Sequence, residues 1–191
     1  AARNTKGEIA AYPLVENIHE DNILKMTIAP ARVSDDVIND AGDIAKKTME
    51  VLKGAGVFGI EMFVDQNDKI LINEIAPRVH NSGHHTLQSC KTSQFEQHLR
   101  AILGLKLGST DLVHRTVMCN ILGPHGFEGK YKPVQLENDG AYLKMYGKDI
   151  SKPQRKIGHF NVVDLSDSKD ISELLKTADE IKNSILINPL D

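Results

Sequence analysis

The chain of 191 residues is 40% hydrophobic and 26% charged, with a formal net charge of −3. This length and composition allow a substantial buried core, which excludes a wholly disordered chain or a small disulfide scaffold. With 23 basic and 26 acidic residues there is no overall positive field, so we expect no nucleic-acid partner. We also expect no membrane span and no secretory signal, and the two cysteines suit a reducing, cytoplasmic setting.

Strands and a helix are predicted in the first third of the chain. Residues 7–17 and 22–33 are rich in β-branched and apolar residues and are separated by a short polar stretch. Ser34 then has the side chain of a helix N-cap and precedes two aspartates, which favours a helix start there. Apolar residues recur at helical spacing as far as Leu52, and Gly54 is a suitable stop.

The later elements are a second helix, three strands and a tail helix. The second helix is expected over residues 94–103, and the strands over 114–123, 140–147 and 156–164. The tail helix is predicted from apolar residues that share one helical face: Ile171, Leu174, Leu175, Ala178, Ile181 and Ile185.

Two apolar β runs on either side of the polar residues 65–68 predict a hairpin. Glu61 and Glu74 lie inside these runs, where an ionised carboxylate is costly unless something compensates it. If Val64 pairs with Lys69, the two glutamates share one face at a diagonal separation of roughly 7–8 Å. Two carboxylates so placed can bind Mg²⁺ or Mn²⁺, although two solvated glutamates that bind nothing are the alternative.

A polar loop follows the second run and contains Arg78, His80 and Asn81. The guanidinium group of an arginine matches a carboxylate, phosphate or bicarbonate in a bidentate manner, so the loop is a candidate anion site. Together with His84 and His85 the loop also suggests zinc, but the helical H-E-x-x-H spacing and cysteine ligands are both missing. A structural role, in which His84 and His85 bond to the loop backbone, stays open.

The chain closely resembles one enzyme family in the segments GIEMFVDQNDKILINEIAPRVHNSGHHT, TSQFEQHLRAILGL and YGKDISKPQRKIGHFN. The family is N5-carboxyaminoimidazole ribonucleotide synthetase, the ATP-grasp ATPase subunit or domain of phosphoribosylaminoimidazole carboxylase. The resemblance extends over residues 1–164. It implies an α+β fold that forms the C-terminal part of an ATP-grasp fold, with a mostly antiparallel sheet and flanking helices over residues 1–112. A small β-rich subdomain that binds the substrate phosphate, with the tail helix, would follow over residues 113–191.

The resemblance implies two cofactors, ATP and Mg²⁺ (or Mn²⁺). Glu61 and Glu74 match the acidic residues that bind the metal ions bridging the ATP phosphates. Phe63 would lie near the nucleotide, although a position in the core is an equal alternative. Many ATP-grasp enzymes carry Glu-x-Asn on the second strand, and Ala76 occupies the Asn position here, so the second metal ion would have fewer protein ligands.

The substrate-binding residues that the resemblance implies are Arg78, His80, Asn81, Lys148, Arg155 and Lys156. The first three would hold bicarbonate, its phosphorylated product and the aminoimidazole, with Arg78 and His80 taking part in catalysis. His80 either moves a proton or only binds the anion. The last three would hold the phosphate of the ribonucleotide, although without the resemblance they are ordinary surface basic residues.

The implied activity converts aminoimidazole ribonucleotide, bicarbonate and ATP to N5-carboxyaminoimidazole ribonucleotide through carboxyphosphate, in de novo purine biosynthesis. The chain matches the C-terminal half of the family, so we expect the N-terminal half with its ATP lid to be a partner, and this half alone to be inactive. A mutase domain or subunit and a homodimer are further implied partners. The alternative is a non-catalytic nucleotide- or metal-binding module derived from an ATP-grasp half. A related formyl or carboxyl transferase is disfavoured by the loop and YGK segments.

Overall fold

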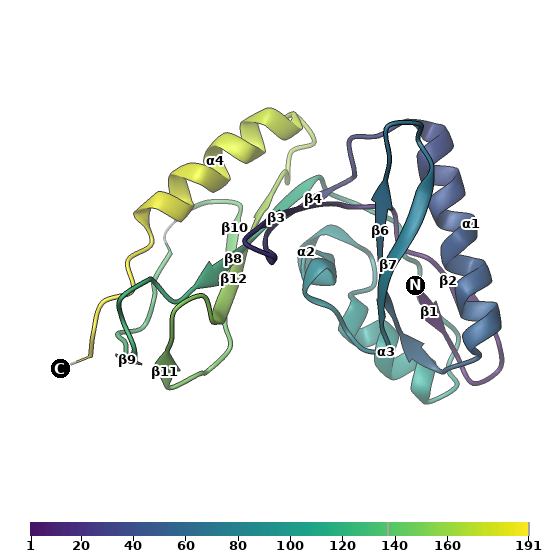
Figure 1. Ribbon diagram of the computed structural model, residues 1–191, viewed down its shortest axis with the longest axis horizontal. Coiled ribbons are helices and arrows are strands. Elements are labelled where there is room, and N and C mark those ends of the chain that lie inside the picture. The colour runs from purple at the N-terminus through teal and green to yellow at the C-terminus, as the bar shows by residue number, and fades with distance from the viewer. Residues whose placement is uncertain (137, 191) are drawn as a thin grey trace. The chain divides into compact units, whose positions relative to one another are not determined.

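The computed structural model describes residues 1–136 and 138–190, which divide into two compact units (Figure 1). Unit 1 comprises residues 1–16 and 29–113, and unit 2 comprises residues 17–28 together with the described part of 114–191. Residues 17–28, which the sequence places in the first domain, therefore belong to the second unit. Across the described residues, no helix combines the length and the apolar character needed to cross a membrane.

Unit 1 contains a three-stranded antiparallel sheet of order β2-β1-β5, a separate hairpin and four helical segments. The strands are β1 (Ala2–Arg3), β2 (Ile9–Ala10), β5 (Gly56–Val57), β6 (Gly59–Val64) and β7 (Ile70–Ala76). The helices are α1 (Asp35–Leu52), the 3₁₀ turn η1 (Asn81–Gly83), α2 (Thr86–Ser89) and α3 (Gln94–Ile102). A small apolar cluster joins the sheet to α3 and is formed by Ala2, Val57, Ala101 and Leu107.

Helix α1 begins where the sequence predicts, because the Ser34 hydroxyl accepts a hydrogen bond from the N–H of Val37. The helix ends at Leu52, and its C-cap is Lys53, which lies one residue before the predicted stop and adopts the left-handed conformation with φ of 56°. Gly54 serves a different purpose, since a Cβ atom there would lie 2.6 Å from Cζ of Phe58. The glycine therefore permits close packing of an aromatic ring and does not itself cap the helix.

Unit 2 is built on a five-stranded sheet of order β10-β12-β8-β4-β3, in which β12 pairs antiparallel with both neighbours. Its strands are β3 (Glu16–Glu20), β4 (Ile23–Ala29), β8 (Thr116–Leu122), β10 (Ala141–Met145) and β12 (Lys156–Val163). A two-stranded ribbon joins β9 (Gly129–Lys130) to β11 (Ile150–Ser151), and α4 (Ile171–Ser184) is the last helix. The three strands predicted in this part of the chain and the tail helix are confirmed.

One predicted boundary in this sheet is wrong, because residues 18–20 of the polar stretch 18–22, which is expected to separate two strands, belong to strand β3. The turn into β4 consists of Asp21 and Asn22 alone, both with positive φ (51° and 59°). Two consecutive residues of this conformation make the tight hairpin turn that matches the twist of paired strands. The sequence pattern does not predict the end of β3, because the side chains of this strand are half-buried or exposed and carry no apolar alternation.

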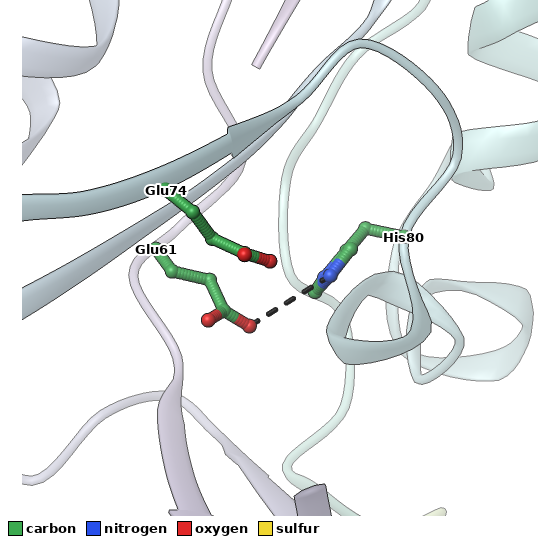
Figure 2. Close-up of side chains that lie close together, drawn as sticks. All are labelled: Glu61, Glu74 and His80. Atoms are coloured by element: carbon green, nitrogen blue, oxygen red, sulfur yellow. Dashed lines mark ion pairs between the residues drawn. The ribbon is translucent and has the colours of Figure 1, made fainter. Parts of the chain in front are cut away.

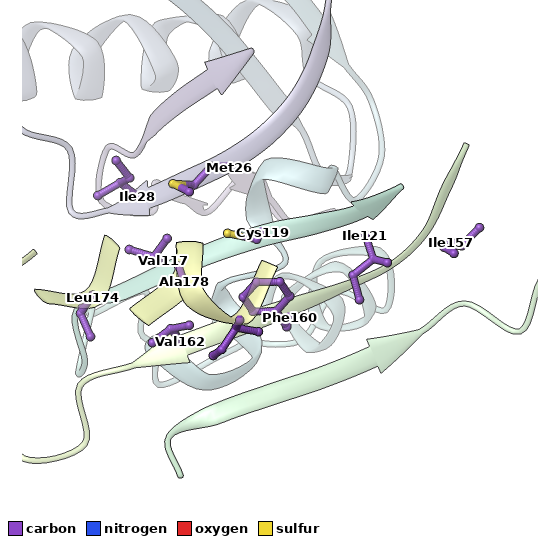
Figure 3. Packing of buried hydrophobic residues seen from close by; sticks show 11 residues of the cluster. Met26, Ile28, Val117, Cys119, Ile121, Ile157, Phe160, Val162, Leu174 and Ala178 are labelled. Carbon is purple, nitrogen blue, oxygen red and sulfur yellow. The ribbon is translucent and has the colours of Figure 1, made fainter. Parts of the chain in front are cut away.

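The core of unit 2 lies between α4 and the sheet (Figure 3). Phe160 on β12 is 1% exposed and packs among apolar residues from β4, β8 and the helix. Leu174, Ala178 and Ile181 form the buried stripe of α4, as the helical spacing predicts. The helix starts with a reciprocal capping box between Asp170 and Glu173.

Candidate functional site

The predicted hairpin is present as β6 and β7, but its predicted register is wrong. Val64 pairs with Ile70, and Lys69 belongs to the turn. The Asp65 carboxylate explains the longer turn, because its Oδ1 accepts hydrogen bonds from the N–H groups of Asn67 (2.8 Å) and Lys69 (3.0 Å). An aspartate that binds the backbone N–H groups following it stabilises a turn in preference to continued strand pairing.

An irregularity in the strand pairing next to Glu61 shifts the register by one residue in the part of the hairpin farther from the turn. Met62 pairs with Ile72 but Glu61 pairs with Glu74, so Asn73 is an extra residue on β7. Such a bulge redirects the side chains beyond it. The two glutamates are therefore directly opposite each other, closer than the predicted diagonal arrangement, and we call them the glutamate pair.

The site loop, residues 77–85, brings His80 to the glutamate pair (Figure 2). One ligand atom from each of the three side chains lies within 4.8 Å of the other two. His80 Nε2 is 3.7 Å from Oε1 of Glu61, and these two side chains are 12% and 16% exposed. Gly59 makes this approach possible, since a Cβ atom there would lie 2.6 Å from Cβ of His80. Two adjacent carboxylates repel each other, so this arrangement favours a bound cation.

The donor set fits a divalent cation. Carboxylate oxygens suit Mg²⁺ and Mn²⁺, and an imidazole nitrogen extends the set towards Mn²⁺ or zinc. Within residues 1–136 and 138–190, the cluster of Glu61, Glu74 and His80 is the one group of three acidic, histidine or cysteine side chains close enough to share an ion. This cluster is therefore a candidate cation site at the base of the hairpin.

The three loop histidines do not form one centre. His84 Nδ1 lies 2.9 Å from Nε2 of Gln94, whereas His85 Nδ1 lies 2.7 Å from the hydroxyl of Ser89. Burial, and to a smaller extent the nearby His84, lowers the pKa of His85 to about 4, so its ring is neutral near pH 7. His85 is therefore a buried structural residue. The loop histidines do not converge in the way that the zinc hypothesis requires.

The other predicted residues of unit 1 are near the chain surface. Arg78 is exposed and its Nη1 donates a hydrogen bond to the carbonyl of Val79. Asn81 is half-buried at the start of η1. Phe63 is 60% exposed on β6, so it does not lie in the core of unit 1.

The predicted basic residues of unit 2 occupy one neighbourhood. Lys148 Nζ donates a hydrogen bond to the carbonyl of Lys156 (2.6 Å) and lies 5.8 Å from the centroid of the Tyr146 ring. Partial burial, and then the positive charge of Arg155, lowers the pKa of Lys148. The guanidinium of Arg155 in turn donates to the carbonyl of Ile150. Concentrated positive charge of this kind favours an anionic ligand.

Sequence reasoning overlooked the residues that support these groups. His159 on β12 is 2% exposed, and its Nδ1 lies 2.9 Å from the hydroxyl of Tyr146. Gln94 donates a hydrogen bond from Nε2 to the carbonyl of His80 in the site loop. A bulge in β12 between Lys156 and Gly158 changes the direction of the strand beside the basic residues. Tyr146, His159 and Gln94 all lie within the segments that resemble the family, but a buried histidine or glutamine reveals its supporting role only through its partners.

Two family models meet near the boundary at residue 113, although residues 17–28 fall within the first model and within unit 2 of the structure. Residues 1–95 match the ATP-grasp domain, and residues 116–173 match the phosphoribosylaminoimidazole carboxylase C-terminal domain. The fold and the paired acidic residues thus define an ATP-grasp protein with that additional domain. The predicted α+β class and ATP-grasp fold are confirmed.

Individual relatives narrow the assignment. N5-carboxyaminoimidazole ribonucleotide synthase of Bacillus subtilis is 43% identical over 172 residues, which cover 90% of this chain and 45% of the relative. The crystal structure of the synthetase from Thermotoga maritima has 47% identity and a TM-score of 0.89, covering 99% of this chain and 51% of that chain. The Aspergillus clavatus synthase in complex with ADP and 5-aminoimidazole ribonucleotide has 36% identity and a TM-score of 0.77, covering 94% of this chain and 50% of that one.

The chain belongs to the N5-carboxyaminoimidazole ribonucleotide synthetase family, and the predicted resemblance is confirmed. It spans about half the length of the relatives that it matches.

Proposed function

We propose that the protein containing this chain is an ATP-dependent ligase of purine biosynthesis that works in the cytoplasm. It would convert aminoimidazole ribonucleotide, bicarbonate and ATP to N5-carboxyaminoimidazole ribonucleotide. The observation that carries the proposal is the convergence of Glu61, Glu74 and His80 in a chain 43% identical to a bacterial synthase. The binding of ADP and aminoimidazole ribonucleotide by the Aspergillus relative supports the same substrates.

In this proposal the glutamate pair holds Mg²⁺ or Mn²⁺ at the ATP phosphates. Such a cation neutralises charge on the transferred phosphoryl group when it is bound. Phe63, exposed two residues after Glu61 on β6, offers an apolar surface to the nucleotide. The close pairing of two carboxylates supports the cation role better than a structural one, because without a cation they repel each other.

The site loop would hold the smaller reactants. An oxygen of bicarbonate attacks the γ-phosphorus of ATP, ADP leaves, and carboxyphosphate forms. The exocyclic amine of the ribonucleotide then attacks the carboxyl carbon, phosphate leaves and the amine loses one proton. Arg78 and Asn81 would bind the anionic acceptor, since a guanidinium donates two parallel hydrogen bonds. His80 either accepts the amine proton or binds the anion.

Lys148, Arg155 and Lys156 would bind the phosphate of the ribonucleotide. The lowered pKa of Lys148 supports this role, because a nearby phosphate dianion would offset the burial and the repulsion from Arg155. The remaining half of the polypeptide would complete the ATP site, and a mutase domain or subunit and a second copy of the chain are further proposed partners.

An ADP-release assay on the full-length protein tests this function. ADP release should require both bicarbonate and aminoimidazole ribonucleotide and should stop when a chelator removes divalent metal. Glu74→Gln should lower kcat by about 100-fold or more, comparable with the loss of one transition-state contact. The control Glu50→Gln, at an exposed position on α1, should leave kcat unchanged. Release of ADP that does not respond to aminoimidazole ribonucleotide would contradict the proposal.

A further inference from the structure

Gln94, the first residue of α3, connects that helix to the site loop through its side chain. The side chain is almost fully buried, with the residue 2% exposed. Its Oε1 accepts a hydrogen bond from the N–H of His80 (2.9 Å), and its Nε2 donates to the carbonyl of the same residue (2.8 Å). This reciprocal pair holds the His80 backbone as a neighbouring antiparallel strand would.

The orientation of the Gln94 amide is determined by these partners, because a backbone N–H only donates and a carbonyl only accepts. Nε2 also lies 2.9 Å from Nδ1 of His84, which accepts the second amide hydrogen when its own proton is on Nε2. Gly83 leaves the space for this amide, since a Cβ atom there would lie 2.5 Å from Oε1. Every polar hydrogen of the buried amide is therefore used by the site loop.

The constraint on the His80 backbone extends to its ring. Cβ of His80 lies against Gly59, so the residue cannot move towards β6 without a clash. Nδ1 of the ring is 2.8 Å from the hydroxyl of Ser82, which orients Nε2 towards Oε1 of Glu61. A side chain held at its backbone and at one ring nitrogen has little freedom left.

We propose that Gln94 is a positioning residue, whose amide holds the His80 backbone so that the imidazole stays beside the glutamate pair. The importance of that position for catalysis rests on the proposed ligase function, whereas the hydrogen bonds themselves do not. Partners that orient the groups around a metal typically contribute about 10–100-fold to metal affinity or activity.

The helix offers a matched control. Gln97 is also buried, at 0% exposed, and its amide makes the same reciprocal pair with the backbone of Gly108 (2.8 Å for each hydrogen bond). Gln94→Met and Gln97→Met each remove one buried amide at nearly constant side-chain volume. Both should lower the stability of unit 1 by a similar amount, but only the first releases the site loop.

The experiment compares these variants in the full-length protein. The Mn²⁺ dissociation constant is measured by electron paramagnetic resonance, and kcat and KM for ATP are measured by ADP release. Gln94→Met should weaken Mn²⁺ binding by about tenfold and lower kcat by about 10–100-fold, with a smaller change in KM. Gln97→Met should leave these quantities nearly unchanged. Equal losses in both variants, or normal Mn²⁺ affinity and kcat in Gln94→Met, would overturn the proposal.

A second variant and a hydrogen-exchange measurement complete the test. If Gln94→Met does not fold, Gly83→Ala crowds the same amide without removing a polar group, and normal Mn²⁺ affinity and kcat in that variant would equally overturn the proposal. If Glu74→Gln binds Mn²⁺ as tightly as the wild-type protein does, the ligase proposal is contradicted instead. Hydrogen exchange at the His80 N–H then decides the role of Gln94. That N–H should lose protection in Gln94→Met but keep it in Gln97→Met, and unchanged protection in both would overturn the positioning role.

Discussion

Gly59 shows how closely single residues are adjusted at the candidate site. It starts β6 and faces Cβ and Cγ of His80, which are held near the backbone and cannot swing away. An added methyl group would be about 2.6 Å from His80 Cβ, a distance that Cβ atoms essentially never show. The absence of a side chain at this position is therefore a requirement for the geometry of the cluster.

We expect Gly59→Ala to displace His80 and to lower kcat of the full-length protein by about 100-fold, as for a misplacement of about 1 Å near the chemistry. The control is Gly42→Ala in the middle of α1, where nothing lies within 4 Å of the added carbon. That variant should keep its activity and gain about 0.5–1 kcal/mol of stability, because alanine is the better helix former. Unchanged activity in Gly59→Ala would contradict the packing argument.

The titration of one residue, His85, should make the stability of unit 1 depend on pH. Its pKa is lowered to about 4 in the folded chain, against about 6.5 for an unperturbed histidine. Between these values the unfolded chain binds the extra proton, so the free energy of unfolding falls as the pH falls from 6.5 to 4. Lowering the pH from 6.5 to 4 should reduce the free energy of unfolding by roughly 3 kcal/mol.

Urea denaturation at pH 7 and pH 4.5 tests this expectation. His85→Asn cannot take up a proton but can still bond to Ser89, so it should show a smaller loss of stability over the same pH interval. The comparison uses the change between the two pH values, which cancels any constant effect of the substitution. The same pH slope in the variant and the wild type would rule out His85 as the titrating group.

The elements differ in how well the sequence predicts them. Helix α1 and the tail helix α4 were predicted within a residue or two, because an N-cap followed by a 3.6-residue apolar period is a local signal. The extent of strand β3 and the register of the hairpin were not, because pairing depends on partners and on turn hydrogen bonds that the pattern does not display. Likewise, Glu61 and Glu74 were predicted to share a face, but only the bulge at Asn73 makes them direct neighbours.

The turn of the hairpin should therefore control the site at its other end. Asp65→Ala removes two hydrogen bonds from the turn and should make hairpin opening easier by about 1–2 kcal/mol. Faster hydrogen exchange at the N–H groups that pair β6 with β7 would report the opening, and Mn²⁺ affinity should fall with it. Gln66→Ala, in the same turn with an exposed side chain, is the control and should change neither quantity. Normal protection in Asp65→Ala would show that the register has another origin.

At the scale of the whole molecule, the sequence indicated two parts but not how the chain is distributed between them. Strand β4 neighbours β8 in the sheet of unit 2, although about ninety residues separate them in the sequence. A segment at the amino end therefore completes a sheet whose other strands come from residues 116–163. Such pairing has no local signal, because each strand shows only that it needs a partner and not which one.

The share of its relatives that this chain covers leads to an expectation for the 191 residues tested by themselves. It carries the glutamate pair, the site loop and the basic residues, but it spans only 45% of the Bacillus subtilis synthase and 51% of the Thermotoga maritima chain. Because phosphoryl transfer depends on groups that enclose the nucleotide and exclude water, we expect no ADP release from these residues alone. Weak Mn²⁺ binding that Glu74→Gln abolishes should nevertheless persist, since both carboxylates are on one hairpin. Turnover close to that of the full-length protein would show instead that this half contains every group that the reaction needs.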